Sequence, residues 1–153
     1  MKKTLLWLLF GGVLAYPIEG IWRIPSGGLV SIYMLPVYGL CFWLVGSMNQ
    51  HRTFYRLSMR LQAFIGAIIV LAVEFVSGCI LNVYLGLDIW DYSHLPLNVC
   101  GQICALYGVL WFFLVPFAVW LEDKLNHIWE RSNGRTSDYD YTLIEAYAEL
   151  FKI

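Results

Sequence analysis

The chain has 153 residues, of which 59% are hydrophobic and only 14% are charged, and its mean hydropathy is +0.63. A soluble domain of this length could not bury so much apolar side chain, so the composition indicates one polytopic membrane domain. The net charge of -1 and the lack of a basic stripe give no reason to expect a nucleic-acid partner.

Four apolar runs predict four membrane spans, because each is close to the ~20 residues that a bilayer requires. The spans cover about residues 4–22, 28–48, 61–83 and 99–121. We therefore expect an all-α fold, in which residues 1–121 form a bundle of four transmembrane helices and residues 122–153 form a cytoplasmic helical tail.

The distribution of positive charge predicts the orientation. Nine of the ten lysines and arginines lie on one side of the spans, and Arg23 lies alone on the other. The positive-inside rule then places both termini in the cytoplasm, in a multi-pass protein of the cytoplasmic membrane. Lys2 and Lys3 before an apolar run also resemble a signal peptide, but the run continues to Trp22, so we expect an uncleaved first span.

The first two spans contain an acidic residue, small residues and a proline. Glu19 lies in the first span and Arg23 follows it by four residues, so the two share a helical face if the helix persists. Gly11 and Gly12 allow another helix to approach closely. In the second span, Pro36 predicts a kink or a break.

Glu74 is the residue that we expect to matter most for function, because a carboxylate inside a bilayer is costly and rarely accidental. Glu74, Gly78 and Asn82 are spaced by four and share one face of the third span. The fourth span is expected to begin with Asn98 and Gln102 on a similar polar face. All these polar groups fall in the outer half of the spans, which predicts a pocket that opens to the outside. Alternatively, Glu74 only holds helices together through hydrogen bonds.

Residues 85–97 connect the third and fourth spans and are too polar for a span but too apolar for a plain loop. We expect a re-entrant or lid-like connection whose segment Trp90, Asp91, Tyr92 and Ser93 caps the pocket. The two aromatic residues are expected to be interfacial anchors. Asp91 could instead bond nearby backbone amides, as aspartate commonly does in turns.

The tail is predicted to contain helix. Residues 122–131 are expected to continue the fourth helix out of the membrane, and Thr142-x-x-Glu145 matches the capping box of a last helix. The polar face of that helix carries Glu145 and Glu149, so we expect it to dock on this protein's cytoplasmic side or on a partner rather than on anionic lipid. Its apolar stripe consists of Leu143, Ile144, Tyr147, Leu150 and Phe151.

No metal or cofactor is expected. His94 is a lone histidine, and a zinc site would need carboxylates to converge on it. Cys100 and Cys104 are four residues apart and so do not form a Cys-x-x-Cys redox motif. Whether Cys79 and Cys100 pair is left open by the sequence.

The stretch from residue 19 to residue 111 resembles a known family, the CmpB-type "putative ABC-transporter type IV" membrane proteins. The residues that carry the resemblance are Glu74, Trp90-Asp91-Tyr92-Ser93, Pro96-x-Asn98 and Gly101-x-x-Cys104, and more loosely Pro36-Val37-Tyr38-Gly39 and Glu19 with Trp22. The resemblance implies a small bacterial multi-pass protein that acts as a permease. Because the chain has no phosphate-binding Gly-rich loop, ATP hydrolysis would require a separate ATPase subunit.

The expected function is that of a small permease-like or transport-associated membrane protein. Its site would bind a cationic or amphipathic ligand, or exchange protons with it, through a polar set: Glu74, Glu19, Arg23, Asn98, Gln102 and Asn82. Two alternatives stay open, a membrane-embedded enzyme that acts on a lipid or lipid-linked substrate and a non-catalytic assembly subunit. Besides the bilayer, we expect a homo-oligomer or an ATPase subunit as partner, because four spans are few for a transporter.

Overall fold

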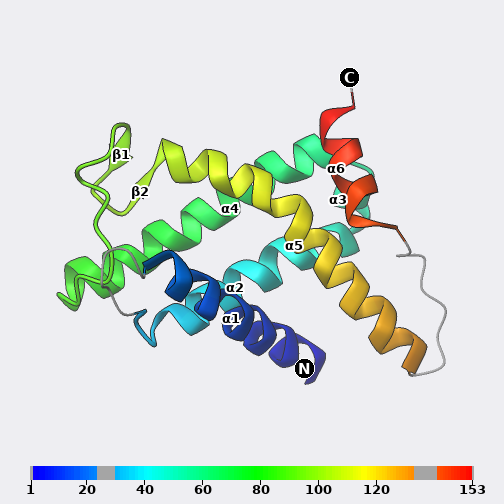
Figure 1. The fold of residues 1–153 in the computed structure, drawn as a ribbon, viewed down its shortest axis with the longest axis horizontal. Coiled ribbons are helices and arrows are strands. Elements are labelled where there is room, and N and C mark those ends of the chain that lie inside the picture. Colours follow the sequence, from blue (N-terminus) through cyan, green and yellow to red (C-terminus); the bar gives the residue numbers. More distant parts are fainter. Residues whose placement is uncertain (1, 24–29, 133–140, 153) are drawn as a thin grey trace. The chain divides into compact units, whose positions relative to one another are not determined.

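The computed structural model describes residues 2–23, 30–132 and 141–152, and most of them are helical (Figure 1). The elements in chain order are α1 (Lys2–Arg23), α2 (Met34–Gly46), a 3-10 turn (Ser47–Gln50), α3 (Arg52–Tyr55), α4 (Met59–Gly78), a π-helical turn (Cys79–Tyr84), β1 (Asn98–Val99), β2 (Ile103–Cys104), α5 (Ala105–Ser132) and α6 (Leu143–Phe151). The expected helical class is therefore confirmed.

Within the described residues, three helical segments are long and apolar enough to cross a membrane: Thr4–Ile21, Met59–Tyr84 and Ala105–Ser132. A fourth apolar helix, α2, is shorter. Both observations agree with a membrane protein. The count of four spans and the cytoplasmic location of the last helix stay predictions.

The predicted second span, residues 28–48, begins too early. Residues 30–33 are not helical, and α2 begins only at Met34, so that Pro36 lies in its first turn. A proline is accommodated there because the first amides of a helix have no helical acceptor. The predicted break at Pro36 is therefore a helix start. In α1, by contrast, the helix continues through Pro17.

The predicted start of the fourth span is also wrong, because residues 98–104 form a β-hairpin instead of helix. Asn98 pairs with Cys104 and Val99 with Ile103 in an antiparallel ladder. Between the strands, Cys100 and Gly101 have φ angles of 52° and 68°. A left-handed backbone at two successive residues suits a tight turn and ends any right-handed helix. Asn98 therefore lies in a strand and Gln102 in the turn of the hairpin, so the expected polar helical face of these two residues is not formed.

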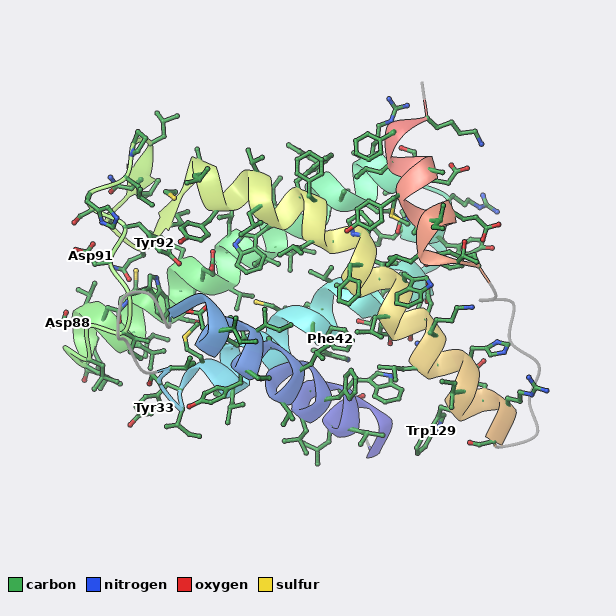
Figure 2. All side chains as sticks on the ribbon, in the orientation of Figure 1. Tyr33, Phe42, Asp88, Asp91, Tyr92 and Trp129 are labelled. Atoms are coloured by element: carbon green, nitrogen blue, oxygen red, sulfur yellow. The ribbon has the colours of Figure 1, made fainter. Side chains whose placement is uncertain are left out.

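The chain forms two compact units, and α2, α4 and α5 contribute residues to both. Unit 1 comprises Met1–Trp43 and Val70–Leu106, and unit 2 comprises Leu44–Ile69 and Tyr107–Ile153. In unit 1, α1 and α2 pack at their glycines: a Cβ on Gly12 would meet the Leu35 backbone, and one on Gly11 would meet Phe42, which Figure 2 labels. This close approach is the one that the small residues of α1 predict.

The core of unit 1 brings α2 together with the connection before the hairpin. Met34, Val37 and Trp90 are buried against one another. Partly buried apolar residues surround them: Val30, Tyr38, Val73, Leu81, Ile89 and Tyr92. The connection is therefore packed onto α2 and α4 and is part of the fold of unit 1.

Unit 2 is built on α5. Its buried residues recur at helical spacing, from Val115 through Val119 to Asn126, and so define one face. Gly66 of α4 lies against this face, since a Cβ there would come within 2.8 Å of the Val115 side chain. The last helix, α6, begins with the predicted capping box, because Thr142 and Glu145 bond each other's backbone amides.

Candidate functional site

Glu74 lies on the buried face of α4. Only 6% of the residue is exposed, and Val70 before it and Gly78 after it at helical spacing are buried too. The thiol of Cys41 on α2 is close enough for an electrostatic interaction with the Glu74 carboxylate. The most apolar 18 residues of the segment Met59–Tyr84 have a mean hydropathy of 2.5, so this carboxyl is enclosed by protein within a strongly apolar helix. The predicted shared face of Glu74, Gly78 and Asn82 is confirmed, since all three are buried.

Glu19 lies on α1 and is half-buried. The expected partner, Arg23, is the last residue of α1, but its side chain lies outside the described residues. The ion pair between the two therefore stays a prediction.

Asn82 and Gln102 come together in a buried network that fastens the connection to the end of α4. The Asn82 amide donates to Gln102 Oε1 at 2.8 Å and to the Trp90 carbonyl at 3.0 Å, and its oxygen accepts from the Ile89 amide at 2.7 Å. The Trp90 indole N–H donates to the Gln102 carbonyl at 3.0 Å. Trp90 is buried, so its expected role as an interfacial anchor is wrong. Both amide side chains are engaged in holding the backbone of this segment.

The remaining polar residues of the connection hold its own turns. Asp91 accepts hydrogen bonds from the amide and the hydroxyl of Ser93, both at 2.8 Å. Asn98 donates to the Leu95 carbonyl at 2.7 Å and accepts from the Gly101 amide at 3.1 Å. These contacts match the alternative reading of Asp91 as a turn residue. Figure 2 labels three residues of this connection, Asp88, Asp91 and Tyr92.

The hydrogen bonds from Ser93, reinforced by the charge of His94, hold the pKa of Asp91 below its usual value of 3.8. A carboxyl group whose pKa is lower in the folded state stabilises the fold at pH values above its pKa in the unfolded state. This stabilisation is lost as the pH falls through the pKa of the folded state. Amide-exchange protection of residues 85–104, corrected for intrinsic rates, should therefore drop as the pH falls below about 4. Asp91→Asn should remove this step, whereas the loop variant Asp88→Asn should retain it. An unchanged step in Asp91→Asn would assign it to another group.

A second buried polar cluster, in unit 2, was missed by the sequence reasoning. Glu122 and Asp123 have no exposed surface, and Asn126 is 1% exposed. Glu122 accepts from the amides of Gln50 at 2.7 Å and Asn126 at 2.6 Å, and Asp123 accepts from the Tyr141 hydroxyl at 2.7 Å. The signal was available: Glu122 and Asn126 continue the spacing of the apolar face of α5. The helix does continue through residues 122–131 as expected, but Glu122, Asp123 and Asn126 are buried in it, whereas charged residues are most often exposed.

No metal-binding cluster of three or more His, Cys, Asp or Glu occurs within residues 2–23, 30–132 and 141–152. The cysteines are free thiols, and Cys100 is exposed while Cys104 is buried. A disulfide between Cys79 and Cys100 is therefore not formed in this structure.

Comparison with known proteins gives one match. The family model described as "Putative ABC-transporter type IV" matches residues 6–145, a range that runs from the first turns of α1 into the start of α6. No curated protein and no solved structure matches the chain.

Proposed function

Because the chain belongs to the "Putative ABC-transporter type IV" family, we propose that it is a small permease-like component of a transport system in the bacterial cytoplasmic membrane. Glu74 is the group that binds a cationic or amphipathic ligand or exchanges a proton with it. Both termini lie in the cytoplasm, as the distribution of lysine and arginine favours.

The observation that supports this proposal is the burial of Glu74 in an apolar helix. Carboxylates inside membrane segments are expensive, and they commonly mark ligand pathways or proton relays. The residue lies on a protein-covered face of α4, near the thiol of Cys41, and not on the exposed side of the helix. Such a site exchanges a proton when a conformational fluctuation opens it to water or to a ligand.

The neighbouring polar residues have a supporting part in this proposal. Asn82, Gln102 and Asn98 use their hydrogen-bonding groups on the connection between α4 and α5. They position the segment around Trp90, while Glu74, with Glu19 and Arg23, supplies the charged groups. The proposed ligand-binding residues are therefore Glu74, Glu19 and Arg23, fewer than the six that the sequence suggested.

A partner is part of the proposal. The sequence has no phosphate-binding Gly-rich loop with Lys and Ser or Thr, so another chain must supply ATP hydrolysis. Three long apolar helices and one shorter one are few for a transport path, which favours a homo-oligomer or a complex with other subunits.

One observation favours a second candidate, a non-catalytic assembly subunit. The network of Asn82, Gln102 and Trp90 closes on itself, and Glu122 is likewise bonded to neighbouring amides. Buried polar groups that are used in this way stabilise a fold without any ligand. The two candidates differ in whether Glu74 titrates in the folded protein.

The test is the reactivity of Glu74 in liposomes that contain the purified full chain. A lipid-soluble carbodiimide modifies protonated carboxyl groups, and peptide-level mass spectrometry locates the adduct. We expect an adduct at Glu74 whose yield falls as the pH rises, and proton uptake driven by a potassium diffusion potential that Glu74→Gln abolishes. The surface variant Glu149→Gln should behave like the unmodified chain. If Glu74 stays unmodified at every pH and Glu74→Gln changes neither fold nor uptake, the assembly reading is correct instead.

A further inference from the structure

The short helix α6 has three distinct faces. Ala146 and Leu150 are buried in unit 2. Glu145, Glu149 and Lys152 form a charged face, on which Lys152 donates to Glu149 at 2.8 Å. Between these two faces runs an apolar stripe, which also lines a shallow hollow and consists of the half-buried Tyr147 and the exposed Ile144, Ala148 and Phe151. A tail helix in solution needs only a buried face and a charged face. The additional apolar stripe is therefore expected to be covered by another molecule.

The contacts of α6 show where along α5 this stripe lies. The residue just before α6, Tyr141, lies at the polar end of the apolar part of α5. Its hydroxyl donates to Asp123, and its carbonyl accepts from the Trp120 indole at 3.1 Å. The other end of the stripe reaches Phe113, whose carbonyl accepts from the Tyr147 hydroxyl at 2.8 Å and whose ring stacks on Phe151. At ~1.5 Å per residue, the levels of Asp123 and Phe113 are roughly 15 Å apart along α5.

Phe113 lies midway along the uncharged part of α5, residues 105–121. It belongs to a row of exposed apolar side chains on this helix, with Val109, Leu110 and Leu114. In a membrane-crossing helix such a row faces lipid. Because Phe151 stacks on Phe113, the apolar stripe of α6 continues the same exposed surface.

We infer that α6 is a membrane-inserted helix, which enters the bilayer obliquely beside α5 and holds the stripe Ile144, Tyr147, Ala148 and Phe151 against lipid acyl chains. Its charged face begins near the headgroups with Glu145 and reaches inward to Lys152. The ion pair between Lys152 and Glu149, and the long reach of lysine, lower the cost of bringing these charges to that level. The occupant is lipid because the stripe is continuous with an apolar surface of a spanning helix, and its acidic flank argues against an attraction driven by anionic headgroups.

The test compares cysteine variants on the two exposed faces of α6. Ile144→Cys and Ala148→Cys place a thiol on the stripe, and Glu149→Cys is the matched control on the charged face of the same helix. Ile144 is 81% exposed on the protein, so its substitution removes no packing. The full chain is reconstituted in nanodiscs of equal parts phosphatidylcholine and phosphatidylglycerol, which leave both membrane faces open. The rate of reaction with a charged, water-soluble maleimide is followed for each peptide by mass spectrometry.

We expect the two stripe thiols to react about tenfold or more slowly than Cys at position 149, as a lipid-covered site requires. In denaturant, all three should react equally. Discs that contain a single chain should show the same protection. Equal rates in the bilayer would overturn the inference in favour of a solvated tail. Protection that appears only in discs with two or more chains would overturn it in favour of a second copy as the occupant.

Discussion

Replacing Gly12 with alanine should separate α1 from α2 and destabilise unit 1 by about 3 kcal/mol. The new Cβ would overlap the Leu35 carbonyl oxygen and come within 3.1 Å of its carbon. Both are backbone atoms inside α2, so no rotamer change can make room. The same holds on the opposite helix, where a Cβ on Gly39 would overlap the Leu8 carbonyl oxygen. The two glycines thus fix one close helix crossing from both sides.

The matched control is Gly20→Ala in the same helix. A Cβ there would lie 3.7 Å from Val30, an ordinary contact, so the better helix propensity of alanine should leave stability unchanged or raise it by up to ~1 kcal/mol. Denaturant titration of the full chain in detergent micelles measures both effects. Similar free energies of unfolding for Gly12→Ala and Gly20→Ala would show that α1 and α2 do not meet at Gly12.

Replacing Asn82 with leucine should release the connection before the hairpin and cost about 2–4 kcal/mol. The change removes three hydrogen bonds at once, those to Ile89, Trp90 and Gln102. Leucine has the same branching at Cγ but is larger, so the loss combines polar groups that are left buried without partners with some overpacking. The backbone of Ile89 and Trp90 cannot recover these bonds from solvent, because Trp90 is packed on Met34 and Val37.

Amide hydrogen exchange of each peptide locates the effect of Asn82→Leu. Protection should fall in residues 85–104, while the α5 and α6 peptides of unit 2 serve as an internal control. A double-mutant cycle with Gln102→Leu should show a combined loss smaller than the sum, because the two side chains share a bond of 2.8 Å. Additive losses would mean that Asn82 and Gln102 act independently.

Features that depend on local sequence rules could be predicted. The burial of Glu74, Gly78 and Asn82 on one face follows from their spacing, and the capping box at Thr142 follows from its partner Glu145. The close approach of α1 to α2 follows from adjacent glycines. Each of these rests on interactions within a helix turn or on the absence of a side chain, which a single sequence displays directly.

The hairpin and the second polar cluster could not be predicted, because both depend on contacts that are distant in sequence. The sequence of residues 99–104 predicts apolar helix. In the structure Gly101 has a left-handed conformation, and its carbonyl accepts from the Tyr92 amide at 2.8 Å. The sequence around Glu122 predicts an exposed charge, because its donor, Gln50, lies far away in the sequence. Asn98 and Gln102 were expected to orient a ligand, and their polar groups bond the chain itself.

The π-helical turn at Cys79–Tyr84 determines which side of the helix carries Asn82 relative to Glu74. An α-helix has 3.6 residues per turn, so side chains four apart drift sideways by ~40° at each step. The i→i+5 bonding of the π turn admits more than four residues per turn and reverses that drift. Asn82 is thereby brought back toward the side of the helix that carries Glu74, so the acidic site and the anchor of the connection share one face. Without the π turn, an uninterrupted α-helix would carry Asn82 about 80° around the helix axis from Glu74, and the anchor of the connection would turn away from the acidic site, even though no residue of either site had been changed.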